Sequence, residues 1–315
     1  MRILVIGAGG QLGWELCNKG VEHGLDILPV DLPDFDITKP SAIKNTVDQA
    51  GASLVINAAA YTAVDQAEKE SDLAFKVNRD GPAYLASICA EVEIPLIHIS
   101  TDYVFDGNKK SPYLETDPVS PLGVYGRSKA AGEAEVRAGL AEHVILRTAW
   151  LYGVHGLNFV KTMLRLGREK ESLRVVADQY GCPTYAADLA DAVLAISEKF
   201  LKNHKLAWGT YHYCGNGVTT WHGFAKRVFE LAKNSDSIVL KEVVPVKTEE
   251  YPTPAKRPAN SVLDCSLFIK NFGIQPRPWT ESLADMINLY YQRPLKNLQF
   301  RSSSRKAKIL TAGIH

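Results

Sequence analysis

Short apolar runs alternate with longer mixed segments through the first half of the chain. The apolar runs predict strands over residues 3–6, 27–30, 54–57, 96–100 and 144–147. The mixed segments between them predict helices over residues 12–23, 42–50, 68–77, 83–92 and 125–139. Alternation at this spacing is typical of βαβ units and a parallel sheet. The strands are continuously apolar because helices cover both faces of such a sheet, so we expect a doubly wound α/β fold over residues 1–150.

The rhythm changes after about residue 150. Helices are expected over residues 159–168, 186–201 and 279–291, a strand over 211–214, and an irregular segment over 245–258, which holds four prolines. We interpret residues 151–292 as mainly a smaller C-terminal substrate-binding lobe, with a segment near 186–214 returning to the sheet. Residues 293–315 are basic, rich in serine and without periodicity, which predicts a flexible tail.

Composition narrows the class of partner. Lys and Arg total 36 against 35 Asp and Glu, a net charge of +1, so nothing favours a nucleic acid. No apolar run reaches the ~18 residues of a membrane span, and the N-terminal run is too short for a signal peptide. The scattered cysteines never form a C-x-x-C pair, which argues against a disulfide framework and fits a reducing cytoplasm. They are Cys17, Cys89, Cys182, Cys214 and Cys265.

A glycine-rich loop follows the first expected strand. Gly7, Gly10 and Gly13 stand at the spacing Gly-x-x-Gly-x-x-Gly, and the helix over 12–23 comes next. Glycines allow a sharp turn and a close approach to a pyrophosphate, which the helix N-terminus then attracts. The loop therefore predicts a Rossmann-type dinucleotide site, with an ordinary glycine-rich turn as the alternative. No Gly-Lys-Ser/Thr follows, which disfavours a P-loop NTPase.

The next two strands end in residues that suit the same ligand. Asp31 is placed to accept hydrogen bonds from an adenosine ribose, and its charge repels a 2′-phosphate, which favours NAD over NADP. Asp36 and Ile37 follow and are expected near the adenine. The small residues Ala58, Ala59 and Ala60 let a dinucleotide lie against the backbone. Solvated loop residues and tight helix–sheet packing remain the alternatives.

Tyr125 and Lys129 are the candidate reacting groups. They are four residues apart, so they share one face of the helix over 125–139. An ammonium there favours the phenolate and lowers the phenol pKa from about 10. Ser100 and Thr101 end a strand and face opposite ways, so one hydroxyl faces the cleft of Tyr125. A hydroxyl, a Tyr and a Lys suit carbonyl reduction with hydride from a cofactor. A solvated helix face, and Thr101 as a loop cap, are the alternatives.

These motifs together resemble one family. The chain is similar to the extended short-chain dehydrogenase/reductases and, within them, to the dTDP-4-dehydrorhamnose reductases. The resemblance covers about residues 1–290 and rests on stretches at residues 7–15, 57–68, 100–105, 115–121, 125–129, 147–153, 158–159, 178–184, 219–222 and 251–261. It implies NAD(P)H-dependent reduction of the C4 ketone of dTDP-4-dehydro-L-rhamnose to dTDP-L-rhamnose, a precursor of surface polysaccharides.

The resemblance also implies roles for individual residues. It makes Thr101, Tyr125 and Lys129 the catalytic set. Its cofactor positions are matched by Gly10, Gln11, Leu12, Asp31, Asp36, Ile37, Ala60, Tyr61, Thr62 and Ile99. Its substrate positions are matched by Val64, Thr101, Asp102 and Trp150, where a Trp face suits the apolar side of a deoxysugar. Arg257 is a candidate clamp for the diphosphate, with Asn158 as a helper.

Two family properties stay open. Some members bind Mg²⁺ through acidic residues at a dimer interface. Glu15 matches one such position, but Ala187 stands at the second, beside Asp188, so a metal site of that kind is doubtful. A homodimer is a further expectation.

Two other functions compete with reduction. One is a non-catalytic relative, such as the regulatory β subunit of methionine adenosyltransferase, against which the intact catalytic set argues. The other is a different nucleotide-sugar enzyme, such as a 4-epimerase or a 4,6-dehydratase. A dehydratase needs an Asp-Glu pair after the strand hydroxyl, and here Asp102 is followed by Tyr103. An epimerase would return its cofactor unchanged.

Overall fold

A six-stranded parallel sheet forms the centre of the computed structural model, which describes residues 1–233 and 235–292. The strand order is β10-β5-β4-β3-β1-β2. The strands are β1 Arg2–Ile6, β2 Asp26–Val30, β3 Ala52–Asn57, β4 Leu96–Thr101, β5 His143–Thr148 and β10 Gly209–His212. This order, with β1 between β2 and β3, is the doubly wound Rossmann-type sheet that the apolar runs predict.

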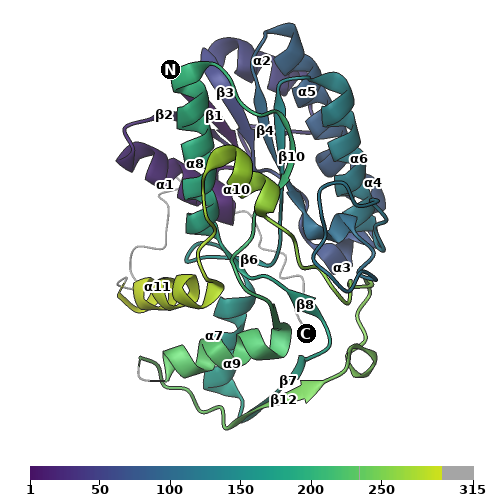
Figure 1. The fold of residues 1–315 in the computed structure, drawn as a ribbon, viewed down its shortest axis with the longest axis vertical. Coiled ribbons are helices and arrows are strands. Elements are labelled where there is room, and N and C mark those ends of the chain that lie inside the picture. The colour runs from purple at the N-terminus through teal and green to yellow at the C-terminus, as the bar shows by residue number, and fades with distance from the viewer. Residues whose placement is uncertain (234, 293–315) are drawn as a thin grey trace.

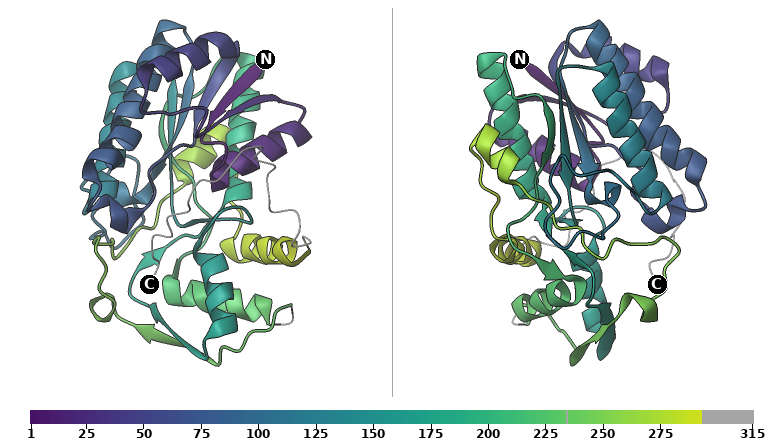
Figure 2. Two further views of the ribbon diagram at one scale, coloured as in Figure 1. Left: turned by 180° about the vertical axis from the view of Figure 1, so that it is seen from behind. Right: turned by 45° about the vertical axis from the view of Figure 1, so that its right-hand side comes forward.

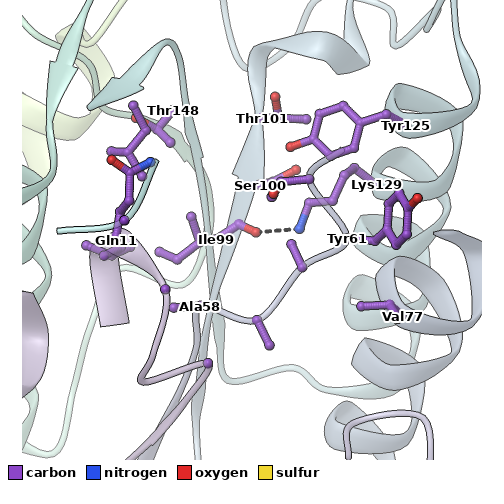
Figure 3. A pocket seen from close by; sticks show the side chains of 18 of the residues that line it. Gln11, Ala58, Tyr61, Val77, Ile99, Ser100, Thr101, Tyr125, Lys129 and Thr148 are labelled. Atoms are coloured by element: carbon purple, nitrogen blue, oxygen red, sulfur yellow. Dashed lines mark hydrogen bonds between the residues drawn. The ribbon is translucent and has the colours of Figure 1, made fainter. Parts of the chain in front are cut away.

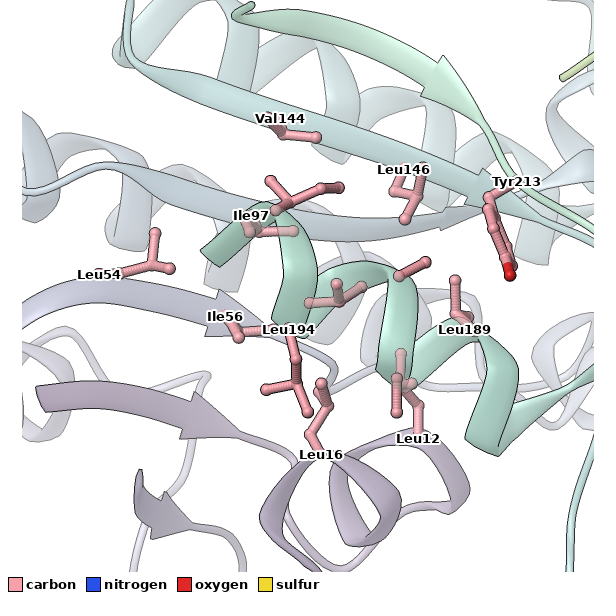
Figure 4. Packing of buried hydrophobic residues seen from close by; sticks show 14 of the residues in the cluster. Leu12, Leu16, Leu54, Ile56, Ile97, Val144, Leu146, Leu189, Leu194 and Tyr213 are labelled. Atoms are coloured by element: carbon pink, nitrogen blue, oxygen red, sulfur yellow. The ribbon is translucent and has the colours of Figure 1, made fainter. Parts of the chain in front are cut away.

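Helices cover both faces of the sheet (Figures 1 and 2). One face carries α1 Gln11–Glu22, α8 Ala186–Asn203 and α10 Ser266–Phe272; the other carries α2 Pro40–Ala50, α5 Gly81–Glu91 and α6 Val124–Gly139. Figure 4 shows Leu189 and Leu194 of α8 packed between the strands and α1. Burying such side chains contributes about 1.5–3 kcal/mol each, so α8 is part of the core of the sheet.

The chain returns to the central sheet after residues 151–203. β10 pairs in parallel with β5, from Gly209 opposite Val144 to His212 opposite Arg147. The sheet therefore includes residues far beyond 150. The division of the chain into a domain over residues 1–150 and a lobe over 151–292 stays a prediction.

The helix expected over residues 68–77 is wrong in detail. The structure has α3 Val64–Ala67, α4 Ser71–Phe75 and a π-helical turn, η1 Lys76–Asp80. The side chain of Asn78 bonds the backbone N–H and C=O of Tyr61. A Cβ at Gly132 of α6 would lie 2.0 Å from the carbonyl oxygen of Asn78. The wide turn thus follows from a backbone-to-backbone contact with α6, which local periodicity does not reveal.

The remaining elements lie below the sheet in Figure 1. The helices there are α7 Phe159–Glu169, α9 Trp221–Ala232 and α11 Trp279–Gln292. The short strands pair as β7 Ser172–Val176 with β12 Glu242–Val246, β8 Tyr180–Gly181 with β11 Thr219–Thr220, and β6 Leu151–Tyr152 with β9 Thr184–Tyr185. The sequence did not predict α9 or α10, and β12 with η3 Thr248–Glu250 gives order to part of the proline-rich segment.

Two expectations concern the ends of the chain and the membrane. The flexible tail expected over residues 293–315 lies outside the described residues. Across residues 1–233 and 235–292, every helix is too short or too polar to cross a membrane.

Candidate active site

A cavity of about 800 Å³ runs along the carboxyl ends of the strands, which is where open α/β sheets bind ligands. It extends from the glycine-rich loop to Tyr125. Most of the residues singled out in the sequence line it, namely Gly7, Gly10, Gln11, Leu12, Asp31, Asp36, Ile37, Ala58, Ala59, Ala60, Tyr61, Thr62, Val64, Ile99, Thr101, Asp102, Tyr125, Lys129, Trp150 and Asn158.

The glycine-rich loop is built by close backbone contacts. Gly7 has φ +82°, and its N–H donates to the carbonyl of Val30 at 3.0 Å. A Cβ at Gly7 would lie 2.5 Å from the backbone nitrogen of Ala59. A Cβ at Gly13 would lie 2.0 Å from the carbonyl oxygen of Gly7. Only glycine fits at both positions. Gly13 does not line the cavity; it lets α1 begin directly against the loop.

The Asp31 side chain contacts the backbone of this loop. Its Oδ2 accepts a hydrogen bond from the Gly9 N–H at 2.6 Å, and its Oδ1 accepts from the Leu32 N–H at 2.8 Å. Asp36 instead bonds the backbone and hydroxyl of Thr38, and the backbone bond lowers the pKa of Asp36. Apolar side chains that the sequence reasoning missed complete this end of the cavity: Phe35, Leu73 and Val77.

Tyr125 stands in the first turn of α6, which Glu68 caps by accepting the Val124 N–H at 2.7 Å. Figure 3 shows its phenol turned toward Thr101. Burial raises the pKa of Tyr125 to about 12, although a side-chain hydrogen bond with Thr101 acts in the opposite direction. Burial, rather than a lysine charge, therefore has the largest effect on the pKa of the phenol. The phenol is protonated at neutral pH.

Lys129 lies one turn further along α6 and is 1 % exposed. Its Nζ donates to the carbonyl oxygen of Ile99 at 2.6 Å (Figure 3). Burial lowers the pKa of Lys129 to about 8. The Lys129 side chain thus points toward β4. With its pKa lowered to about 8, a fraction of Lys129 is neutral near physiological pH.

The two strand hydroxyls separate as the pleat requires. Ser100 donates to Glu133 Oε1 at 2.6 Å, on the α6 side of the sheet. Thr101 donates to Asp102 Oδ1 at 2.9 Å and lies beside Tyr125. Asp102 begins the short helix η2 Asp102–Val104, and burial raises its pKa to about 6. Ser100 and Thr101 both line the cavity, but Thr101 carries the hydroxyl that lies beside the phenol.

Two polar atoms in the cavity wall lack an internal partner. Within residues 1–233 and 235–292, Asp102 Oδ2 and Thr148 Oγ1 are buried without a well-formed hydrogen bond, although the Ser261 hydroxyl lies near enough to lower the pKa of Asp102. Thr148 lies opposite Tyr125 in Figure 3, beside Gln11. Buried polar atoms of this kind are satisfied by a ligand or by water. Thr148 was not predicted, because its only signal in the sequence is its place at the end of a strand.

Aromatic rings close the far end of the cavity. Trp150, with φ 48°, stacks on Trp221 at a centroid distance of 3.6 Å and an interplanar angle of 8°. Trp221 opens α9, where the Thr220 hydroxyl caps the helix by accepting the Gly223 N–H at 3.1 Å. Asn158 holds this end to the glycine-rich loop through Gln11 Oε1 at 2.9 Å. Trp221 lines the cavity, and sequence reasoning assigned it no role.

Arg257 and Glu15 lie outside the cavity. Arg257 forms a two-pronged ion pair with Asp65, with contacts of 3.0 and 2.7 Å, that ties the proline-rich segment to α3. Glu15 is buried on α1. Asp188 is bonded to Ser282 and to Arg277. In the described part of the chain, no cluster of three or more His, Cys, Asp or Glu side chains is arranged to hold a metal ion.

Comparisons with known proteins show which family this sequence and fold resemble. A family model described as the RmlD substrate binding domain matches residues 1–292. A dTDP-4-dehydrorhamnose reductase of Aggregatibacter actinomycetemcomitans is 43% identical over 289 residues, covering 90% of this chain and 98% of that protein. The crystal structure of a dTDP-4-dehydrorhamnose reductase from Clostridium acetobutylicum has a TM-score of 0.86 at 42% identity, covering 92% and 99% of the two chains. A Bacillus anthracis dTDP-4-dehydrorhamnose reductase in complex with NADP has a TM-score of 0.84 at 40% identity, covering 91% and 99%.

Proposed function

Since the chain belongs to the RmlD substrate binding domain family, we propose that it catalyses the NAD(P)H-dependent reduction of the C4 ketone of dTDP-4-dehydro-L-rhamnose to dTDP-L-rhamnose. The observation that carries the proposal is the arrangement of Thr101, Tyr125 and Lys129 in one cavity with the glycine-rich loop. A hydroxyl, a buried phenol and a lysine beside a dinucleotide cradle are the groups that carbonyl reduction requires.

The cavity fits a nicotinamide dinucleotide at its loop end. Gly7 and Ala59 approach so closely that no side chain intervenes. Helix α1 begins at Gln11 in the same cavity wall, and the first N–H groups of a helix attract a phosphate. Gly10, Gln11 and Leu12 would hold the pyrophosphate, and Asp31 the adenosine ribose. When bound, the cofactor supplies the hydride.

The protein's own residues supply the proton. Thr101 and Tyr125 would hold the ketone oxygen between their hydroxyl groups, which orients the C4 carbon. Tyr125 then donates its phenolic proton to that oxygen as negative charge develops on it. Burial raises the pKa of Tyr125 to about 12, so the phenol carries its proton at neutral pH but is a weak acid. The negative charge that hydride transfer places on the ketone oxygen supplies the driving force for the proton transfer.

The other end of the cavity suits a deoxysugar nucleotide. Asp102, whose carboxylate lines the cavity, would accept a sugar hydroxyl. Trp150 and Trp221 present an apolar wall to the sugar. Arg257 would bind the diphosphate once Asp65 releases part of its guanidinium. For the reductant, the Asp31 carboxylate favours NADH over NADPH, because it repels a 2′-phosphate.

The test is a reduction assay with purified protein, dTDP-4-dehydro-L-rhamnose, and NADH or NADPH. Stoichiometric cofactor oxidation with formation of dTDP-L-rhamnose supports the proposal. Turnover of a sugar nucleotide without net cofactor consumption indicates an epimerase instead, and no turnover with any nucleotide sugar indicates a binding subunit. Tyr125→Phe should remove turnover while leaving cofactor affinity nearly intact; near-native turnover of this variant would contradict its role as the acid.

A further inference from the structure

The last residue of β5, Thr148, has a buried hydroxyl group in the wall of the cavity. Thr148 is 7 % exposed, and its Oγ1 forms no hydrogen bond within residues 1–233 and 235–292. Its register partner on β4 is Thr101, whose hydroxyl donates to Asp102 and accepts from the Tyr103 N–H at 3.2 Å. Burying a hydroxyl group without a partner is costly, so an unpaired one in a cavity wall indicates a contact with a ligand.

Thr148 lies between the glycine-rich loop and the reacting groups. In Figure 3 its side chain stands beside Gln11 and across the cavity from Tyr125. Gln11 begins α1 directly after the loop, where the pyrophosphate would bind. Tyr125 would contact the ketone oxygen. A dinucleotide that extends from the loop to the ketone must therefore place its nicotinamide ring, which carries the hydride, alongside the end of β5.

The chemistry of this part of the wall matches that ring. Ile99 on β4, Ala149 directly after β5 and Leu151 on β6 also line the cavity, and their side chains are apolar. A dihydronicotinamide is a flat apolar ring with a single amide group, whose C=O accepts and whose NH₂ donates. A threonine hydroxyl can both donate and accept. An apolar wall with one unpaired hydroxyl therefore suits an apolar ring with one amide.

The sugar has its own wall at the end of the cavity where Trp150 stacks on Trp221. We propose that Thr148 is a cofactor-binding residue whose hydroxyl forms a hydrogen bond with the carboxamide group of the nicotinamide. This bond holds the ring against the end of β5, so that its hydride-bearing carbon lies next to the ketone that Thr101 and Tyr125 hold. The proposal rests on the proposed function, because the carboxamide belongs to the nicotinamide cofactor that reduction requires.

The test compares the affinities of NADH and ADP-ribose, which lacks the nicotinamide ring, by calorimetric titration of the intact protein. If the native protein binds NADPH more tightly, NADPH and 2′-phospho-ADP-ribose take their place. Thr148→Val removes the hydroxyl and keeps the shape, so it should weaken NADH by roughly five- to tenfold, the effect of one hydrogen bond, and leave ADP-ribose unchanged. Thr148→Ser keeps the hydroxyl and should bind NADH almost as the native protein does. Thr184→Val is the matched control, because it removes a buried hydroxyl that bonds the Cys182 carbonyl outside the cavity lining, and both affinities should stay in place.

A second readout needs no ligand. Because Thr148 Oγ1 forms no hydrogen bond in the described part of the chain, Thr148→Val should not lower the thermal unfolding midpoint of the ligand-free protein. A midpoint lower by several degrees would mean that the hydroxyl bonds the protein itself in the free state, and it would overturn the proposal.

The binding results can also contradict the proposal. Equal weakening of NADH and ADP-ribose in Thr148→Val would overturn it, since the side chain would then shape the cavity without contacting the amide. An unchanged NADH affinity would overturn it as well, and a raised KM for the nucleotide sugar alone would assign the hydroxyl to the substrate. A native protein that binds NADH but reduces no nucleotide sugar would refute the proposed function, whereas the comparison of NADH with ADP-ribose would still decide the role of Thr148.

Discussion

Replacing Glu133 by Gln tests how much the ion pair beneath the site holds α6 on the sheet. Glu133 is 0 % exposed and accepts hydrogen bonds from Arg147 Nε at 2.8 Å, Arg147 Nη2 at 2.6 Å and Ser100 Oγ at 2.6 Å. Gln keeps the shape of Glu133 but leaves the guanidinium of Arg147, 2 % exposed, without its counter-charge. Removing one partner of a buried pair costs roughly 3–5 kcal/mol.

Thermal unfolding measures this loss. At roughly 2–4 °C per kcal/mol, the midpoint of Glu133→Gln should fall by on the order of 10 °C. Arg137→Gln is the matched control, because Arg137 contacts the same carboxylate at 3.2 Å with a side chain that is 41% exposed. An exposed pair contributes only about 0–1 kcal/mol. A midpoint for Glu133→Gln no lower than that of Arg137→Gln would refute the reasoning.

The same pair gives a dependence on pH. Burial acts to raise the pKa of Glu133, but the bonds from Arg147 and Ser100 outweigh it and lower the pKa below its ordinary value. A carboxyl whose pKa is lower in the folded state stabilises the fold fully above the unfolded value of about 4.3. That contribution is lost as pH falls through the folded-state pKa. The difference in unfolding free energy between the native protein and Glu133→Gln should therefore narrow below about pH 4.

Further variants probe the cavity itself. Asp31→Ala should raise kcat/KM for NADPH relative to NADH, and an unchanged ratio would remove Asp31 from that selection. Arg257→Ala should raise KM for the nucleotide sugar by roughly tenfold with kcat little changed, the effect of a lost charged hydrogen bond; a fall in kcat alone would contradict a binding role. Thr101→Val should lower kcat by roughly 10- to 100-fold with KM for the cofactor preserved, and near-native kcat would show that the hydroxyl does not hold the ketone. Trp221→Leu should raise KM for the sugar nucleotide but not for the cofactor, which steady-state kinetics with each substrate varied in turn will check.

The sheet and the cofactor end of the site were predictable because their signals are local. Parallel strands buried on both faces read as unbroken apolar runs, and each expected central strand is found within two residues of its bounds. The carboxyl ends of parallel strands meet at one edge. Residues at or just after the strand ends, such as Asp31, Ala59 and Thr101, therefore line one cavity even though they are far apart in the chain.

The rest depends on contacts between distant segments. Thr148 follows an apolar run and resembles core, because its place beside Thr101 exists only through the register that pairs β5 with β4. Trp221 joins Trp150 only because α9 packs against the elements after β5. The spacing of Tyr125 and Lys129 predicted one helix face correctly, but it did not show that Lys129 points to the strand rather than to the phenol.

The return of the chain to β5 has a consequence for synthesis. β10 completes the sheet and α8 covers its apolar face, yet both are translated after the whole run from β1 to β5. When β5 has just emerged from the ribosome, the nascent chain exposes an unpaired strand edge and the leucines that α8 will later cover. The sheet is therefore complete, and its apolar face covered, only after residues 186–212 have been translated.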